Sequence, residues 1–70
     1  MFVFYDKDEM EVRFFESFWK VCEHIAREVL DMNDIKTLEL YREGLLALNR
    51  SMASRNIEIE WVEQGQPFYV

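Results

Sequence analysis

Residues 57–61 read Ile-Glu-Ile-Glu-Trp, so apolar and charged side chains alternate at every position. Successive side chains of a strand point to opposite faces of a sheet, which places the three apolar residues on one face and Glu58 and Glu60 on the other. This alternation is typical of a sheet that is covered on one face only. The sequence therefore predicts a sheet whose uncovered face carries acidic side chains.

Two segments near the start of the chain also have strand character. Residues 2–5 are β-prone, residues 10–14 alternate again, and the polar segment from Asp6 to Glu9 predicts a four-residue hairpin turn between them. The third strand is expected over residues 57–63. The side chains expected to face the helices are Phe2, Phe4, Val12, Phe14, Ile57, Ile59 and Trp61. Those left for the outer face are Val3, Tyr5, Phe15 and Val62; the alternative is that Phe15 turns inward at the junction of strand and helix and that Tyr5 simply covers the sheet.

The chain between these strands repeats at the helical period. A first helix is expected from its N-cap, Ser17, to about residue 31, and a second from an Asn33 or Asp34 cap to about residue 54. The first apolar stripe comprises Phe18, Trp19, Cys22, Ile25, Ala26, Val29 and Leu30. The second comprises Leu38, Tyr41, Leu45, Leu48 and Met52.

Four positions around the second helix complete the expected structure. Leu40 lies on the back of this helix, away from the stripe, and Asn56 is a left-handed stop before the last strand. Arg42 and Asn49 project between two apolar edges. Arg42 is interpreted as extending its stem over the core and Asn49 as bonding to a carbonyl, although Arg42 as a polar anchor for a partner is an alternative.

These elements predict one small acidic α+β domain over residues 1–70. The expected order is ββααβ(β), a two-layer sandwich in which two helices cover one face of a largely antiparallel, three- or four-stranded sheet. Residues 64–67 are expected to turn and residues 68–70 to form the optional fourth strand at an edge. The third strand lies beside either the first or the second. Seventy residues leave no room for a second domain.

The charge balance limits the partners. Fourteen acids against eight bases give a net charge of −6, which argues against nonspecific binding to nucleic acid or to an anionic membrane and favours a basic protein surface. No apolar run approaches the ~20 residues of a membrane span. The chain becomes charged at Asp6, too early for a signal peptide, and its single cysteine indicates a reducing compartment. A cytoplasmic location is expected.

Catalytic signatures are sparse. His24 is the only histidine and is expected to be exposed on a solvated helix face, while Cys22, two positions away, cannot face it on a helix. The two glycines, Gly44 and Gly65, form no phosphate-binding loop, and clusters of histidine and cysteine that would suit a metal are missing from the sequence. We therefore expect a protein that is not an enzyme and that has no cofactor or metal site.

Acidic and aromatic side chains form the expected binding surface. Side chains two apart on a strand are separated by about 7 Å, a spacing comparable to the pitch of phosphates along DNA. Glutamates on one sheet face and acids on the adjoining turn would then imitate a phosphate path; the alternative is an ordinary solvated face. Eleven aromatic residues also exceed the needs of a two-layer core. The predicted partner-binding residues are Tyr5, Asp6, Asp8, Glu9, Glu11, Phe15, Leu40, Glu58 and Glu60.

These features favour a small acidic inhibitor that occludes a nucleic-acid-handling or defence protein. Compactness, acidity, surplus aromatic residues and sparse catalytic signatures match the general character of phage or mobile-element inhibitors of the anti-CRISPR or anti-restriction type. The alternatives are an immunity protein or antitoxin that neutralises a toxic nuclease, and a structural homodimer or complex subunit without an inhibitory role. The expected partner is a basic protein, with a second copy of the chain as the other candidate.

Overall fold

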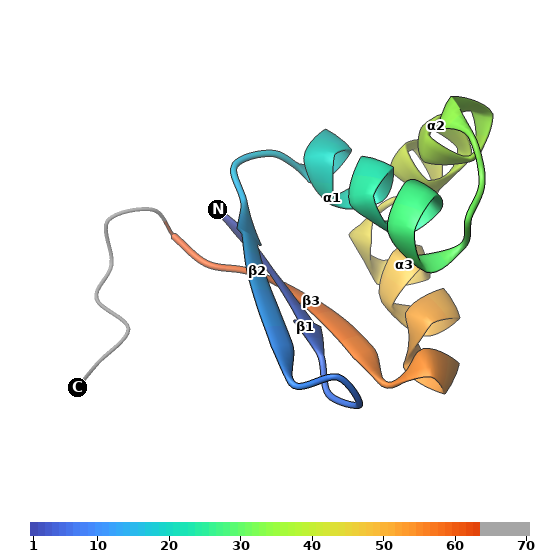
Figure 1. The fold of residues 1–70 in the computed structure, drawn as a ribbon. Coiled ribbons are helices and arrows are strands. Elements are labelled where there is room, and N and C mark those ends of the chain that lie inside the picture. The colour runs from blue at the N-terminus through green and yellow to red at the C-terminus, as the bar shows by residue number, and fades with distance from the viewer. Residues whose placement is uncertain (64–70) are drawn as a thin grey trace.

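A three-stranded antiparallel sheet forms one layer of the molecule. The computed structural model describes residues 1–63, with strands β1 (Phe2–Asp6), β2 (Glu11–Phe15) and β3 (Ile57–Trp61) in the order β2-β1-β3. The third strand therefore joins the first, which becomes the centre of the sheet (Figure 1). The expected turn at residues 64–67 and strand at residues 68–70 lie outside the described residues.

Helices cover one face of this sheet (Figure 1). Helix α1 (Phe18–His24) continues into a π-helical turn, η1 (Ile25–Val29), and is followed by α2 (Asp34–Glu43), α3 (Leu45–Met52) and a 3₁₀ turn, η2 (Ala53–Arg55). Helix α1 packs against β1 and β2, α3 packs against β3, and α2 packs against the other two helices. The predicted α+β class and the ββααβ order are confirmed.

The predicted helix boundaries are set by local hydrogen bonds. The Oγ of Ser17 accepts from the Lys20 N–H at 3.3 Å, and the Oδ1 of Asn33 accepts from the Ile35 N–H at 3.0 Å. Each satisfies an amide that the first turn of a helix leaves without an internal partner. Asn56 adopts the left-handed conformation, with φ 62° and ψ 35°, and ends the last helical turn. Both N-caps and the left-handed stop are confirmed.

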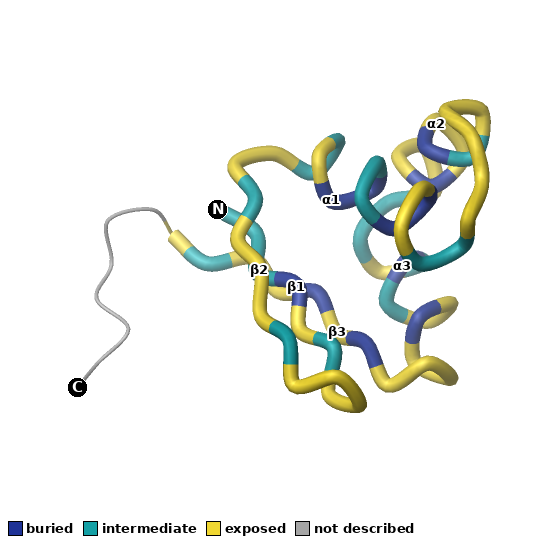
Figure 2. The backbone as a smooth tube through the Cα atoms, viewed as in Figure 1, coloured by how far each residue is buried: buried dark blue, intermediate teal, exposed yellow. Residues whose placement is uncertain are grey.

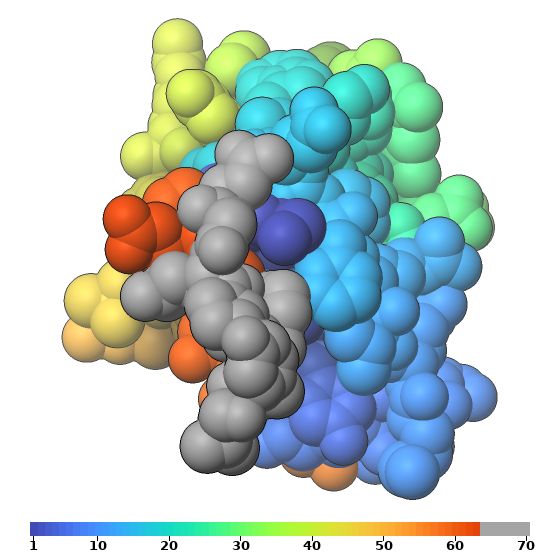
Figure 3. Space-filling view, turned by 90° about the vertical axis from the view of Figure 1, so that its left-hand side faces the viewer, coloured from blue at the N-terminus to red at the C-terminus, as the bar shows by residue number. Residues whose placement is uncertain are grey.

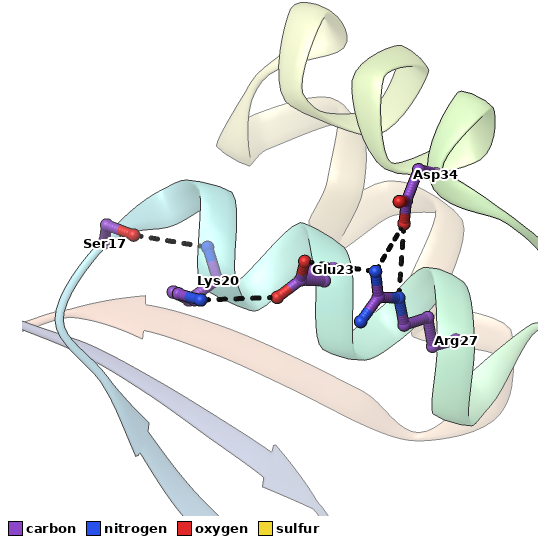
Figure 4. A network of polar contacts seen from close by, with 5 residues as sticks. All are labelled: Ser17, Lys20, Glu23, Arg27 and Asp34. Carbon is purple, nitrogen blue, oxygen red and sulfur yellow. Dashed lines mark hydrogen bonds and ion pairs between the residues drawn. The ribbon is translucent and has the colours of Figure 1, made fainter.

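Ion pairs connect the first two helical segments (Figure 4). The guanidinium of Arg27 lies 2.8 Å from the Asp34 carboxylate and 3.4 Å from that of Glu23. Glu23 also lies 3.6 Å from the Lys20 ammonium, one turn earlier in α1. Lys20, Arg27 and Asp34 are exposed and Glu23 is partly buried, so we assign these pairs a role in the orientation of α2 on α1 more than in stability.

The predicted second helix is interrupted at Gly44. This residue has φ 94° and ψ 172°, a conformation that favours glycine, and it ends α2 and begins α3. The break changes which side of α2 is buried: Leu38 and Tyr41 are 42% and 47% exposed, whereas Leu40 is only 3% exposed. The prediction that Leu40 is a surface residue available to a partner is therefore wrong, because it belongs to the core.

The core lies between the sheet and the helices (Figure 2). Strand β1 contributes Phe4, and β3 contributes Ile57 and Ile59. The helices contribute Val21, Cys22, Ile25, Ala26, Leu40, Leu48 and Met52. The expected stripe of the first helix is confirmed, since its central residues are fully buried.

The hairpin turn is one residue later than predicted. Asp6 ends β1, and its Oδ1 accepts from the N–H groups of Asp8 at 3.1 Å and Glu9 at 3.2 Å. Such an Asx turn fixes the chain direction just after the strand. Met10, expected to begin the second strand, has φ 56° and lies in the turn. This turn therefore pairs Asp6 with Glu11.

The orientation of β2 is opposite to the one expected. Phe4 pairs with Arg13 and Tyr5 with Val12, and paired residues share a face. Val12 and Phe14 therefore point to the outer face, where they are 50% and 54% exposed. The prediction that these two residues face the helices is wrong, because a four-residue loop pairs the even-numbered residues of β2 with odd-numbered residues of β1, which puts Val12 on the face of Tyr5. Phe15 packs against the core, which confirms the alternative that it turns inward and excludes its outward placement.

The outer edge of β3 is closed by a side chain from α3. The Nδ2 of Asn49 donates to the Ile59 carbonyl at 2.8 Å, and its Oδ1 accepts from the Ile59 N–H at 2.8 Å. The expected bond from Asn49 to a carbonyl is confirmed, and the same side chain also pairs the amide. Asn49 thus acts in place of a neighbouring strand at this position.

Candidate functional site

The candidate site is the sheet face that the helices leave uncovered, here called the outer face. It is lined by Val3, Tyr5, Val12, Phe14, Glu58, Glu60 and Val62, which form a shallow, mainly apolar hollow. Figure 3 views the molecule from this side, with β2 in light blue on the right and residues of β3 in orange to red on the left. All three strands therefore contribute side chains to one surface.

Glu58 and Glu60 lie on the outer face as predicted. Their neighbours Ile57 and Ile59 are buried under the helices, so the alternation of β3 leaves the two glutamates no other orientation. The Glu58 carboxylate lies 3.4 Å from the Lys7 ammonium, with both side chains about half exposed. Glu60 makes no ion pair with any described residue. An exposed pair such as Lys7–Glu58 contributes little energy, so both carboxylates remain available to a partner.

The remaining predicted acids lie elsewhere. Glu11 pairs with Arg13 at 2.7 Å, on the helix-facing side of the sheet. The prediction that Glu11 shares a face with Glu58 and Glu60 is wrong, because the hairpin register turns it to the opposite side. These three glutamates therefore do not form one row at the spacing of phosphates.

A second hollow lies at the hairpin end of the molecule. Its acids are Asp6, Asp8, Glu9, Glu11 and Glu28, and its basic groups are Arg13, His24 and Arg55. Asp6 accepts the turn amides, and the Oδ1 of Asp8 accepts from Asn56 Nδ2 at 3.0 Å, which joins the turn to the start of β3. No group of three or more His, Cys, Asp or Glu within residues 1–63 is arranged to hold a metal ion.

His24 is partly buried between aromatic rings. Its ring centroid lies 4.9 Å from that of Phe4, edge to face, and 5.3 Å from that of Phe15. Burial, together with the nearby positive charge of Arg13, lowers the pKa of His24 against the opposing effects of Glu11 and Glu28. The prediction of an exposed histidine on a solvated face is wrong, because the edge of the sheet extends beneath this turn of the helix.

Cys22 is a core residue. It is fully buried, and burial raises the pKa of its thiol to about 11. The thiol is therefore protonated at neutral pH and has no access to a substrate, which agrees with the predicted structural role.

The structure brings together three of the predicted site residues, Tyr5, Glu58 and Glu60. It places Phe15 against the core, Leu40 within it, and the four acids Asp6, Asp8, Glu9 and Glu11 at the hairpin end. Sequence reasoning missed Val12 and Phe14 as outer-face residues. The signal that would have found them is the four-residue length of the turn, because a loop of that length pairs even-numbered residues of one strand with odd-numbered residues of the other.

Comparison with known proteins identifies no relative: no protein-family model, curated protein or solved structure matches this chain. Within residues 1–63, none of the helices has the length and apolar character that a bilayer crossing requires. The function is therefore argued from the outer face itself.

Proposed function

We propose that this protein binds a basic partner protein through the outer face and thereby inhibits it. The observation that carries the proposal is the composition of this face. Half-exposed apolar side chains from β1 and β2 lie beside two outward glutamates from β3. This combination of an apolar centre and a charged border is typical of protein interfaces.

The apolar part of the face supplies the contact that a stable complex requires. Tyr5 and Phe14 present aromatic surface, and Val12 lies opposite Tyr5 in the sheet. Aromatic residues held rigidly on strands lose little conformational freedom on binding and commonly act as anchors of an interface. We expect Tyr5 and Val12 to become buried in the complex.

The charge of the face and of the whole chain selects the partner. Glu58 and Glu60 project beside the apolar patch, and the net charge of −6 attracts a basic surface over a longer range. The partner that fits is a protein whose lysine or arginine side chains surround an apolar spot. Surfaces that hold nucleic acid are rich in such basic groups.

Inhibition follows from occupation of that surface. A nucleic-acid-handling protein that is covered by this chain cannot hold its nucleic acid at the same place, because the two ligands compete for the same basic side chains. The acidic groups accelerate the encounter, and the apolar patch slows the dissociation.

The partner can be identified by a crosslinking experiment. A photoreactive amino acid at position 5 is expected to crosslink a basic protein in cells, whereas the same group at Glu43, an exposed residue at the end of α2, is expected not to. An acidic partner, or equal crosslinking from both positions, would contradict the proposal.

Charge reversal then tests the surface with the purified partner. The Glu58→Lys/Glu60→Lys variant is expected to lower the association rate constant at least about tenfold at low salt and to flatten its salt dependence. The matched control is Glu16→Lys/Glu43→Lys, which changes the net charge equally at exposed sites outside the outer face. If the association rate constant falls by the same factor in both variants, net charge alone governs binding and the outer face is not the site.

A further inference from the structure

We propose that two copies of the chain join along β2, antiparallel about a two-fold axis at Val12, to form one continuous six-stranded sheet. The inference concerns the edge of the sheet and is independent of the function proposed for the outer face. Three observations support it: the β3 edge is capped at Ile59 by Asn49, the β2 edge directs backbone groups outward, and the charges along β2 are self-complementary.

The two edges of the sheet differ. At the β3 edge, the Asn49 side chain pairs both the N–H and the C=O of Ile59. Strand β2 has a neighbouring strand on one side only among the described residues, and α1 contacts it from the face of the sheet. In Figure 1, β2 lies on the side of β1 away from β3, and no labelled element lies beyond it. An edge of this kind is the natural place for another strand to add.

The hydrogen-bonding pattern shows which groups of β2 point outward. Met1 and Val62 exchange backbone bonds of 3.0 Å and 2.8 Å, and the Lys7 N–H donates to the Asn56 carbonyl at 3.0 Å. Odd-numbered residues of β1 therefore bond to β3, and even-numbered ones to β2. Because Phe4 pairs with Arg13, the bonds to β1 come from the odd-numbered residues of β2. The N–H and C=O of Val12 consequently point away from the sheet.

The charges of β2 select the second copy as the added strand. In an antiparallel pair centred on Val12, Glu11 of each copy lies opposite Arg13 of the other. The two Val12 residues then form a hydrogen-bonded pair, and the two Glu11–Arg13 pairs occupy the neighbouring, non-hydrogen-bonded positions, where opposing side chains approach more closely.

Other strands and registers fit less well. A pair centred on Arg13 would place the two arginines opposite each other, and like charges at such positions are destabilising. An apolar strand would leave Glu11 and Arg13 with only their ion pair to each other, and charged residues that point to the covered side of an edge strand oppose such additions. A second copy offers the complementary order of charge, with glutamate facing arginine twice.

Exchange of the two charges provides the decisive test. Glu11→Arg places arginine opposite arginine, and Arg13→Glu places glutamate opposite glutamate. Each variant is therefore expected to sediment as a monomer at concentrations where the parent protein is dimeric. An equimolar mixture is expected to form a heterodimer, because both positions of the Glu11→Arg strand then carry arginine and both positions of the Arg13→Glu strand carry glutamate.

Net charge would not explain the formation of a heterodimer in the mixture, because both variants remain acidic overall. Glu16→Arg, an exposed substitution outside β2, is the control and is expected to leave dimerisation unchanged. A monomeric parent protein from about 10 µM to about 1 mM would overturn the proposal, as mass action must favour a dimer in that range if one forms. A mixture that stays monomeric would overturn it as well.

The backbone itself can be tested at Val12. Val12→Pro removes an N–H that β1 does not use, so the monomer is expected to keep its sheet while the dimer is lost. Val12→Thr retains the amide and the β-branched shape and is expected to dimerise. Far-ultraviolet circular dichroism and urea unfolding establish that each variant is folded. A folded Val12→Pro variant that still dimerises would show that β2 is not the interface.

Discussion

At the scale of single residues, Thr37 stands out because its hydroxyl is buried without a partner. The residue lies in α2, is fully buried, and its Oγ1 forms no hydrogen bond within residues 1–63. A buried hydroxyl that loses its water and gains no partner costs about 1–3 kcal/mol. Thr37 is thus a site where the packing of α2 is not optimal for stability.

We predict that Thr37→Val stabilises the fold by about 1 kcal/mol, because valine keeps the shape and removes the unpaired hydroxyl. Urea unfolding followed by circular dichroism measures the change. Thr37→Ser is the matched control: it keeps the hydroxyl but loses a methyl group, and it is expected to be destabilised by about 1 kcal/mol. A Thr37→Val variant less stable than the parent would mean that the hydroxyl has a partner.

His24 links stability to pH. Burial lowers its pKa in the folded state, so the unfolded chain, with a pKa near 6.5, binds a proton more readily. The contribution to stability is therefore present above about pH 6.5 and is lost as the pH falls through the lower pKa of the folded state. Protonation of this ring opposes folding.

We predict that the midpoint of urea unfolding falls between about pH 7.5 and about pH 5.5, a range above the ordinary pKa of glutamate. His24→Phe retains a ring against Phe4 and Phe15 but cannot titrate, so its midpoint is expected to change less over the same range. If parent and variant show the same pH dependence, other groups cause it.

At the scale of elements, Gly44 decides how the second half of the chain packs. A continuous helix from residue 34 to residue 54 would carry Leu40 on its back, whereas the break at Gly44 lets α2 turn Leu40 into the core while α3 runs along β3. The glycine is required for its backbone conformation, because a Cβ placed on it would meet nothing within 4 Å.

We predict that Gly44→Ala destabilises the fold by about 1–3 kcal/mol, since an L-residue at φ 94° and ψ 172° is strained. A D-alanine at the same position, introduced by chemical synthesis, suits this conformation and is expected to match or exceed the parent stability. Urea unfolding of the two variants compares the same added methyl group in opposite chirality. An equal loss of stability in the Gly44→Ala and D-alanine variants would point to a steric cause.

Elements with strong local signals were predictable, and those fixed by tertiary context were not. The alternation of β3 and its buried neighbours determined the direction of Glu58 and Glu60. In β2 the pattern was misleading: Glu11 and Arg13 point to the helix side, because a four-residue loop pairs them with the inward, even-numbered residues of β1. An edge strand tolerates this arrangement, since the helical layer covers only part of it.

At the scale of the whole molecule, the class, the order of elements and the layering followed from the sequence. The strand order did not, because the pairing of β1 with β3 depends on contacts between the two ends of the described chain. Most of the candidate surface was predictable: Val3, Tyr5, Glu58, Glu60 and Val62 were expected on the outer face and lie there. The two residues of β2, Val12 and Phe14, required the pairing of the hairpin.

The central place of β1 has a consequence for biosynthesis. This strand leaves the ribosome early, yet one of its two partners, β3, follows only after residues 7–56 have been made. Until then the nascent hairpin has an open side at which Phe4 is not enclosed. The sheet can be completed only once β3 has been made, so slow translation or termination before β3 would leave an intermediate with exposed apolar surface for chaperones and proteases to recognise.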